Sequence, residues 1–463
     1  MSPNAFMHPA SYRDPSGFMF EKDGVLYRQV NKVFKEHYDH FIQSGCYKFL
    51  TEESRLISHQ TIDENLTGDP EGYLTLKPEK IDFISYPYEW SFDMLKDAAL
   101  LTLQLVKDAV SFGLILKDAT PYNIQWHKGK FIFIDTLSFE KYNETEPWIA
   151  YRQFCESFLG PLLLMHYHKT SFQQLSLSYP EGIPLTIIKK LLPSKSRFSL
   201  HTYLHIHVHA TISGGNKVNN NRKVIFSKKK MLNLVNSLET LVNGLRFSQQ
   251  ESTWSAYYEE AGKRDDYIDQ KKKIIAAWIE AIPGITRAAD LGANEGEFSK
   301  LLSEKNIPVV AADFDSLCIN NFYNQIKSDS IKNIQPLIID LSNPSPAIGV
   351  NNEEHSSFLS RCQADLVLAL ALIHHLAIGK NIPFEKIAAF FSRVTEHLII
   401  EYVPKEDEKV KMLLKNKQDI YTEYNEKNFV SIFEKYFSIL ERKIVGKTER
   451  VLFKMKVINL PPQ

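Results

Sequence analysis

Short runs of apolar residues alternate with stretches of helical spacing from about Thr286 onward. This alternation favours a parallel β-sheet with helices on both of its faces. The apolar runs predict strands at Arg287–Leu291, Pro308–Asp313, Ile334–Leu341, Ala364–Leu372 and Glu396–Val403. The stretches between them predict helices near Gly296–Lys305, Asp315–Lys327 and Phe384–Val394.

The pattern changes near the end of the sequence. Phe437–Val445 and Arg450–Ile458 are two β-rich runs separated only by Gly446-Lys-Thr-Glu. Such a short separation predicts a hairpin, which adds an antiparallel strand. Together with the five strands before it, the hairpin gives a predicted sheet of seven strands.

A polar segment rich in glycine and asparagine, Ser213–Arg222, separates two differently patterned halves and predicts a linker or exposed loop. Lys228–Leu245 then has helical spacing and leads to an aromatic, charged stretch around Trp254. We therefore expect residues 1–210 to form one domain, 211–250 a linker with a connecting helix, and 251–463 a second domain.

Composition narrows the class of protein. Hydrophobic residues make up 44% and charged residues 24%, which is typical of a soluble globular protein. Lys+Arg and Asp+Glu are equal at 55 each, so no global field attracts nucleic acid or an anionic membrane, although local basic stretches remain possible.

The four cysteines lack the C-x-x-C spacing of zinc sites and disulfide frameworks, and they fit a reducing cytosol. The first residues lack the basic and apolar regions of a signal peptide. The longest apolar run, Leu366–Ile373, is too short to cross a bilayer. A cytoplasmic protein with no membrane span is expected.

The stretch Ala288-Ala-Asp290-Leu-Gly292-Ala-Asn294-Glu-Gly296 predicts a buried strand that enters a glycine-rich turn before a helix. In doubly wound sheets this is where ligands bind. The dinucleotide motif G-x-G-x-x-G is absent, since only two glycines stand here with three residues between them. The carboxylates of Asp290, Glu295 and Glu297 disfavour a pyrophosphate and suit the cationic S-adenosylmethionine.

Two further acids follow the next two predicted strands. Asp313 ends the second strand, where its carboxylate would accept hydrogen bonds from ribose hydroxyls. Asp315 is better explained as the cap of the following helix. Asp340 ends the third strand, where it would accept a hydrogen bond from an adenine amino group. Acids at three successive strand ends, in register with a glycine turn, indicate a ligand site.

On these residues the second half resembles the class I S-adenosylmethionine-dependent methyltransferases. Asp290, Gly292, Asn294 and Gly296 match the first motif of that family, Asp313 its ribose acid and Asp340 its adenine-side acid. The resemblance implies an α/β domain with a seven-stranded Rossmann-like sheet, S-adenosylmethionine as the cofactor, and methyl transfer to an unidentified acceptor.

The fourth predicted strand is followed by Ile373-His374-His375-Leu376, which resembles the strand-to-helix segment of many small-molecule methyltransferases, where a His-His-Leu string opens the helix beside the methyl-transfer site. His374 or His375 would serve as the base for a hydroxyl acceptor, or would cap backbone groups or line the cofactor pocket. Glu401, at the end of the fifth strand, is either an acceptor contact or part of the pocket wall.

In the first half, Asp118-Ala-Thr-Pro-Tyr-Asn123, followed by a hydrophobic run ending at Asp135, resembles the catalytic loop of protein kinases and aminoglycoside phosphotransferases. The resemblance implies an α+β domain with Asp118 as base and with Asn123 and Asp135 as Mg²⁺ ligands. The predicted hairpin Gly17–Val30 and the predicted long helix Phe92–Phe112 follow the order of that fold.

Several parts of a working kinase are missing. Leu116 replaces the usual histidine, no G-x-G-x-x-G covers the phosphates, and Leu26-Tyr-Arg28-Gln stands where a lysine is expected. These losses favour a degenerate, pseudokinase-like domain that recognises substrate. An active kinase using Mg²⁺ and ATP stays open as an alternative, and so does a non-catalytic protein in which both halves only bind.

Strings in both halves, such as Ile84-Ser-Tyr-Pro-Tyr-Glu-Trp-Ser91 and Trp148-Ile-Ala-Tyr-Arg-Gln-Phe-Cys155, resemble a bacterial family of two-part proteins. Its members are often labelled methyltransferases and sometimes nodulation host-specificity proteins. His201, His205, His207 and His209 are compatible with a metal site if the segment is a strand, but no Asp, Glu or Cys accompanies them, and we predict no metal.

Overall fold

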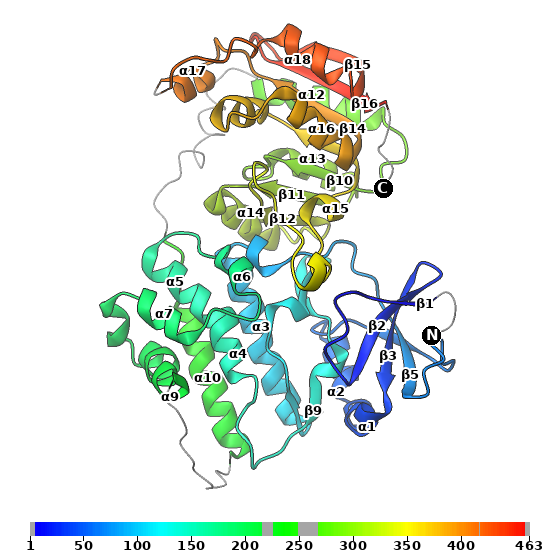
Figure 1. Ribbon diagram of the computed structural model, residues 1–463, viewed down its shortest axis with the longest axis vertical. Helices are drawn as coiled ribbons and strands as arrows, with labels where there is room; N and C mark the ends of the chain where they lie inside the picture. Colours follow the sequence, from blue (N-terminus) through cyan, green and yellow to red (C-terminus); the bar gives the residue numbers. More distant parts are fainter. Residues whose placement is uncertain (1–4, 215–225, 249–266, 416, 459–463) are drawn as a thin grey trace. The chain divides into compact units, whose positions relative to one another are not determined.

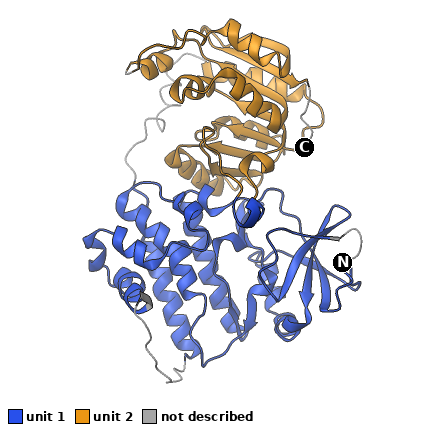
Figure 2. Cartoon of the chain, viewed as in Figure 1, with its two compact units in different colours: residues 1–250, 348–355 blue, residues 251–347, 356–463 orange. Residues whose placement is uncertain are grey.

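The computed structural model describes residues 5–214, 226–248, 267–415 and 417–458. The chain folds into two compact units (Figure 2). Unit 1 consists of Met1–Gln250 and the short segment Ile348–His355, and unit 2 consists of Glu251–Ala347 and Ser356–Gln463.

Unit 2 is built on one seven-stranded sheet with the strand order β12-β11-β10-β13-β14-β16-β15 (Figure 1). All neighbouring pairs are parallel except those made by β16, which runs antiparallel to β14 and to β15. The strands are β10 (Ala288–Leu291), β11 (Val309–Asp313), β12 (Ile334–Ile338), β13 (Ala364–Ala369), β14 (Thr395–Tyr402), β15 (Phe437–Ile444) and β16 (Val451–Val457).

The seven strands predicted from the sequence are all present, including the terminal hairpin. Two of them, β12 and β13, end three residues earlier than predicted, for local reasons. After β12 the chain turns at Asp340, whose carboxylate accepts a hydrogen bond from the Ser342 N–H at 2.9 Å. After β13 the backbone of Ala371 has a φ of +50°, which ends the extended conformation before Leu372.

Helices cover the sheet, as the strand–helix alternation predicts. α13 and α14 pack against β11 and β12, and α16 packs against β13, β14 and α18. The helices of unit 2 are α12 (Tyr267–Glu280), α13 (Glu297–Ser303), α14 (Ser316–Ser328), α15 (Phe358–Arg361), α16 (Phe384–Val394), α17 (Glu408–Leu414) and α18 (Glu426–Phe433), together with the π-helical turn η9 (His375–Gly379).

Unit 1 begins with an antiparallel sheet in the order β1-β2-β3-β5-β4. The predicted hairpin corresponds to β2 and β3, and the predicted long helix is α3, whose inner face is fully buried. The strands of unit 1 are β1 (Ala5–Met7), β2 (Gly17–Lys22), β3 (Val25–Asn31), β4 (His59–Ile62), β5 (Gly72–Pro78), and the pairs β6 (Leu114–Leu116) with β9 (Phe139–Lys141) and β7 (Ile124–His127) with β8 (Lys130–Phe133).

The rest of unit 1 is helical. Its longer helices are α1 (Lys35–Gln43), α2 (Cys46–Glu52), α3 (Phe92–Ser111), α5 (Gly160–His168), α7 (Leu185–Leu191), α9 (His209–Gly214) and α10 (Lys228–Gly244). Its shorter helical turns are η1 (Lys32–Phe34), η2 (Pro87–Glu89), η3 (Pro121–Asn123), η4 (Thr136–Ser138), α4 (Tyr151–Phe154), η5 (Cys155–Leu159), α6 (Leu175–Ser178), η6 (Ser194–Phe198), α8 (Leu200–Thr202), η7 (Tyr203–Val208) and η8 (Val350–Asn352).

One expectation about the middle of the chain is corrected, and one open question is answered. The helix predicted at Lys228–Leu245 is present as α10, but it packs against α3 inside unit 1 and is not a connection outside it. The histidine string does not form a strand, because residues 200–214 run as a continuous helix through α8, η7 and α9. Most of the polar segment Ser213–Arg222 and the stretch around Trp254 lie outside the described residues.

Candidate functional site

The glycine turn between β10 and α13 lies at the carboxyl end of the parallel strands. Gly292, Asn294 and Gly296 have φ values of +87°, +51° and +76°, a left-handed conformation that glycine and asparagine adopt most readily. The N–H groups of Gly292 and Ala293 both donate to the carbonyl of Ala312, at 2.8 and 3.0 Å. The turn is therefore fastened to the neighbouring strand β11.

The two glycines of this turn differ in what surrounds them. A Cβ on Gly296 would lie 1.9 Å from Cζ of Phe322, so the ring of α14 occupies the space of any side chain there. A Cβ on Gly292 would lie 3.4 Å from Leu372, which is ordinary contact. Gly296 thus permits close packing of α13 against α14, whereas Gly292 is required mainly for its backbone conformation.

Asp313 joins the turn to the end of β11. Its carboxylate accepts a hydrogen bond from the Asn294 N–H at 2.9 Å and another from the Asp315 N–H at 2.9 Å. Burial raises the pKa of Asp313 to about 6, despite these backbone donors. Asp315 itself accepts from the N–H groups of Leu317 and Cys318 and caps α14, as predicted from the sequence.

Asp290 and Asp340 have different surroundings. Asp290 is buried at the end of β10 and accepts a hydrogen bond from the Ser299 hydroxyl of α13 at 2.7 Å, and burial raises its pKa to about 6. Asp340 follows β12 and lies 3.2 Å from Lys380 Nζ. Burial opposes ionisation of Asp340, but hydrogen bonds from Ser342 and Lys380 lower its pKa below the ordinary value.

His374 and His375 stand at the start of η9, with ring centroids 4.1 Å apart. His374 is 1% exposed, and its Nδ1 has no hydrogen-bond partner among the described residues. Burial lowers the pKa of His374 well below its ordinary value and, with the nearby charge of Arg450, lowers the pKa of His375 to about 4. Both imidazoles are therefore neutral at neutral pH.

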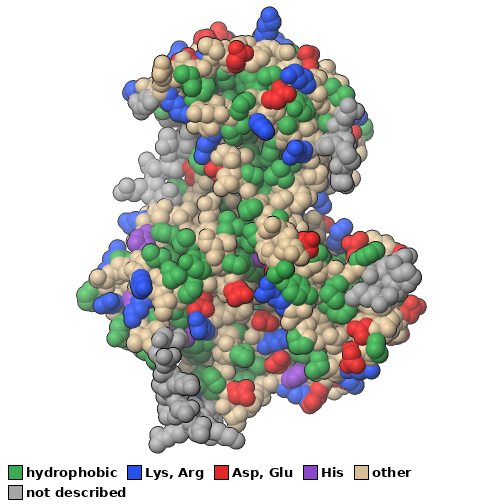
Figure 3. Space-filling view, in the orientation of Figure 1, with side chains coloured by type: hydrophobic (Ala, Val, Ile, Leu, Met, Phe, Trp, Pro, Cys, Tyr) green, Lys and Arg blue, Asp and Glu red, His purple; other side chains and the backbone are tan. Residues whose placement is uncertain are grey.

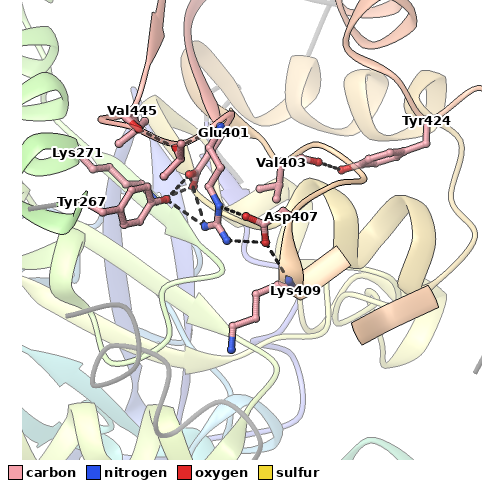
Figure 4. A network of polar contacts seen from close by, with 10 residues as sticks. Tyr267, Lys271, Glu401, Val403, Asp407, Lys409, Tyr424 and Val445 are labelled. Atoms are coloured by element: carbon pink, nitrogen blue, oxygen red, sulfur yellow. Dashed lines mark hydrogen bonds and ion pairs between the residues drawn. The ribbon is translucent and has the colours of Figure 1, made fainter. Parts of the chain in front are cut away.

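Glu401, at the end of β14, is the centre of a buried polar network (Figure 4). Its carboxylate accepts from Lys271 Nζ at 2.6 Å and from the Tyr267 hydroxyl at 2.5 Å. Burial opposes its ionisation, but Lys271 and Arg450 lower the pKa of Glu401 below the ordinary value. Because its oxygens are occupied by these donors, Glu401 holds α12 against β14.

Arg450 extends the network to α17. Its guanidinium donates to Tyr267 at 3.1 Å and forms a bidentate pair with Asp407, with distances of 2.8 and 3.0 Å. Asp407 in turn caps α17 by accepting from the Lys409 N–H. The network links α12, β14, α17 and the turn that precedes β16.

Sequence reasoning identified Glu401 but missed the four residues that surround it. One signal was available, because Lys271 shares a helix face with Tyr267, Ile275 and Ile279 at spacings of four residues. A lysine on an otherwise apolar face is buried only when it is paired. No local pattern marks Asp407 or Arg450.

In unit 1, the predicted Mg²⁺ ligand Asp135 is already bound to a cation. Arg28 of β3 forms an ion pair with its carboxylate, and the Ser138 hydroxyl donates to it as well. Burial opposes ionisation, but the charge of Arg28 lowers the pKa of Asp135 below its ordinary value. The positive charge of Arg28 therefore neutralises Asp135.

Asp118 and Asn123 are the other two residues that resemble the kinase catalytic loop, and both interact with the segment that contains Asp135. The carbonyl of Asn123 accepts from the Ile134 N–H at 2.8 Å, which places Asn123 beside the strand that leads to Asp135. Burial and the charge of Asp135 raise the pKa of Asp118 to about 6. A carboxyl of this pKa is partly protonated near neutral pH.

Three of the four histidines of the string bond to serine hydroxyl groups, and the fourth stacks on a tyrosine ring. Ser237 of α10 bonds to His201 Nδ1 at 2.9 Å and to His205 Nε2 at 2.8 Å, and Ser196 bonds to His207 Nε2 at 2.9 Å. His209 stacks on Tyr151 with a centroid distance of 4.6 Å. Their contacts fasten the helix to its neighbours.

Comparison with known proteins gives one relative over nearly the whole chain. Nodulation protein NoeA of Rhizobium meliloti (strain 1021) is 31% identical over 453 residues, which cover 96% of this chain and 94% of NoeA. No family model matches the chain. Within the described residues, no helix has both the length and the apolar composition needed to cross a membrane.

Several solved structures have low sequence identity and low structural similarity to this chain, including the following three. The N-methyltransferase NodS from Bradyrhizobium japonicum WM9 is 11% identical with a TM-score of 0.31, covering 42% of this chain and 97% of NodS. Magnesium protoporphyrin IX methyltransferase from Synechocystis PCC 6803 with bound SAH is 17% identical with a TM-score of 0.31, covering 41% and 83% of the two chains. The bifunctional kinase-methyltransferase WbdD is 16% identical with a TM-score of 0.28, covering 42% and 39%.

Proposed function

The chain belongs to the family of nodulation protein NoeA, and on the geometry of its unit 2 we propose that it transfers a methyl group from S-adenosylmethionine to an acceptor. The observation that carries this proposal is the hydrogen bond between the Asn294 N–H and the Asp313 carboxylate. It joins the glycine turn to the acid of the next strand at the carboxyl edge of the sheet, where doubly wound folds bind their ligands.

The residues proposed to contact S-adenosylmethionine lie at this carboxyl edge of the sheet. Gly292 and Asn294 line the turn, and Asp313 keeps acceptor capacity for the ribose hydroxyls beyond its two backbone bonds. Asp340 would accept from the adenine amino group. Asp290 and Gly296 act indirectly, because Asp290 is bonded to Ser299 and Gly296 is packed on Phe322. They keep the turn in shape.

The proposed acceptor contacts are His374 and His375. A sulfonium methyl group is already activated for displacement, so positioning supplies most of the rate enhancement. A neutral imidazole accepts a hydrogen bond from a hydroxyl or amino group and takes up its proton when the methyl group is transferred. Glu401 serves as a positioning residue, because its carboxylate is engaged by Lys271 and Tyr267.

For unit 1 we propose a role in recognising the acceptor. The departures from kinase sequences at Leu116 and Arg28, and the Arg28–Asp135 ion pair, support recognition over phosphate transfer. Mg²⁺ would have to displace a buried guanidinium from Asp135 before it could bind there. An active kinase remains the second candidate for this unit, with Asp118, Asn123 and Asp135 in the kinase roles.

Isothermal titration calorimetry with S-adenosylmethionine tests the cofactor assignment. Wild type is expected to bind, and Asp313→Ala to lose at least about tenfold in affinity, since a hydrogen bond to a charged acceptor contributes about 1.5–3 kcal/mol. Asp329→Ala, at the exposed end of α14, is the matched control and should bind as wild type does. Absence of binding by wild type, or undiminished binding by Asp290→Ala with Asp313→Ala, contradicts the proposal.

Turnover with candidate acceptors is the complementary test, because it separates an enzyme from a binding protein. His375→Ala is expected to lower the rate of methyl transfer and leave S-adenosylmethionine affinity unchanged. Tight cofactor binding with no methyl transfer to any acceptor tried would favour the non-catalytic alternative.

A further inference from the structure

One long segment of unit 1 contains no acidic residue. Between Glu181 and Glu239 there is not one Asp or Glu, whereas ten Lys and Arg residues occur. The chain as a whole is neutral, with equal numbers of basic and acidic residues. Positive charge is therefore concentrated in this segment.

The helix formed by α8, η7 and α9 has an exposed apolar face in the same segment. Leu200, Leu204 and Ile212 recur at spacings of four and eight residues and are 67%, 47% and 66% exposed. Thr202, Ile206 and Ala210 are buried on the opposite face. The wide turn of the π-helix η7 keeps positions four residues apart in line, so the apolar side chains form one stripe.

Phe198 and Leu191 add to this stripe from neighbouring elements. Phe198, at the end of η6, is 91% exposed, and Leu191, at the end of α7, is 44% exposed. η6 contacts both α8 and η7, and α7 contacts η7 and α9. The five side chains therefore belong to one surface, which we call the α7–α9 surface.

Basic side chains stand around these apolar ones. Lys190, Lys195 and Arg197 come from α7 and η6, and none of them has a carboxylate partner among the described residues. Lys195 contacts the ring of Tyr167 and Lys189 donates to Thr211 of α9. Figure 3 shows blue Lys and Arg side chains among green hydrophobic ones over the region that Figure 1 labels α7 and α9.

We propose that the α7–α9 surface docks on a membrane surface containing anionic lipid. A helix that exposes leucine, isoleucine and phenylalanine beside lysine and arginine, without acids, is suited to the interface between headgroups and acyl chains. The apolar side chains enter the interface, and Lys190, Lys195 and Arg197 pair with lipid phosphates. The absence of acids over Gly182–Leu238 supports a uniformly negative partner.

Co-sedimentation of the full chain with vesicles tests this proposal. Binding is expected to vesicles of phosphatidylcholine mixed with phosphatidylglycerol, to be weak with phosphatidylcholine alone, and to decrease as NaCl increases. Lys195→Glu with Arg197→Glu should lower the affinity by about fivefold or more per charge, because each basic residue near an anionic surface contributes about 1 kcal/mol. Phe198→Ser with Leu204→Ser should also lower the affinity for vesicles, and this loss should not depend on the NaCl concentration.

Matched controls come from exposed residues elsewhere in unit 1. Val33→Ser with Ile149→Ser removes two apolar side chains that are 70% and 78% exposed, and Lys48→Glu with Lys80→Glu reverses two charges. Both controls should bind vesicles as wild type does. Far-UV circular dichroism and melting temperature show whether each variant is folded.

Three results would overturn the proposal. These are equal binding to neutral and anionic vesicles, equal losses in the control variants, and no binding by wild type to either vesicle. The last result would assign the α7–α9 surface to a protein partner instead. None of these results depends on S-adenosylmethionine binding by unit 2.

Discussion

Lys271 Nζ and Glu401 Oε2 lie 2.6 Å apart, and both side chains are almost completely buried. They fasten α12 to the end of β14. Tyr267 and Arg450 complete the arrangement, so that the positive charges of Lys271 and Arg450 face the negative charges of Glu401 and Asp407. In a buried network of paired charges, removing one member leaves its partner as an unpaired buried charge, which is strongly destabilising.

Lys271→Met is expected to lower the free energy of unfolding by about 3–5 kcal/mol, because it leaves the Glu401 charge with one cation fewer in a buried site. The double variant Lys271→Met with Glu401→Gln should recover a substantial part of that loss. Urea unfolding of the two single variants and the double variant measures the coupling. Lys272→Met, which breaks a partly exposed ion pair between the same helix and Glu297, is the control. Additive losses in the double variant would show that the pair is not coupled.

Gly296→Ala is expected to be much more destabilising than Gly292→Ala. Both positions have positive φ, so both variants bear a conformational cost of about 1 kcal/mol. Only at Gly296 would the new methyl group also overlap the Phe322 ring, which adds about 1–3 kcal/mol or more of overpacking. Gly284→Ala, at a φ of +72° with no atom within 4 Å, isolates the conformational cost. Equal melting temperatures for the Gly296 and Gly284 variants would refute this explanation.

The sheet of unit 2 could be predicted from the sequence because each strand is a short apolar run bounded by a turn. The spacing of those runs fixes both the type of element and, through the crossover helices, the parallel arrangement. The positions of Asp313 and Asp340 at strand ends could be predicted for the same reason, since a strand end is a local feature. The sequence could not decide whether the histidine string is a strand or a helix, and the structure shows a helix in which Ser196 and Ser237 bond to three of the histidines.

The buried network could not be predicted in the same way. Asp407 and Arg450 are 43 residues apart in the sequence, and nothing near either residue reveals the other. The ion pair between Arg28 and Asp135 is likewise a contact between distant segments. From the sequence, Arg28 was expected to stand where the kinase pattern has a lysine, but its ion pair with Asp135 is seen only in the structure.

Asp313 should make stability depend on pH between about 4 and 6. Burial raises its pKa to about 6, above the ordinary value of 3.8, so the folded state binds more protons than the unfolded state in that window. The contribution of Asp313 to stability is therefore greatest below the ordinary pKa and is lost as pH rises through about 6. The free energy of unfolding of Asp313→Asn should therefore increase relative to that of wild type as pH rises from about 4 to 7. Hydrogen bonds lost in the variant change this difference by the same amount at every pH.

Urea unfolding of wild type and Asp313→Asn across this pH range measures the difference. Asp329→Asn, at the exposed end of α14, controls for the general effect of removing a carboxylate. A stability difference that does not change with pH would contradict the raised pKa. In the same window, S-adenosylmethionine binding by wild type should strengthen as pH rises and Asp313 ionises, because the ionised carboxylate is the stronger acceptor for ribose hydroxyls.

The two candidate roles of unit 1 predict opposite effects of Mg²⁺ with ATP on the melting temperature, because Arg28 is paired with Asp135. If unit 1 recognises the acceptor, the pair is structural, and Arg28→Met should lower the free energy of unfolding by about 3 kcal/mol by leaving a buried carboxylate unpaired. In that case Mg²⁺ with ATP should not raise the melting temperature of wild type, because the guanidinium occupies the carboxylate that would bind the metal. If unit 1 is an active kinase, Mg²⁺ with ATP should raise the melting temperature, and Asp135→Ala should abolish that rise.

Lys107→Met, which breaks a pair with Glu239 elsewhere in the unit, controls for the loss of an ion pair as such. A nucleotide effect that persists in Asp135→Ala would contradict the assignment of Asp135 as a metal ligand and place the nucleotide at another site.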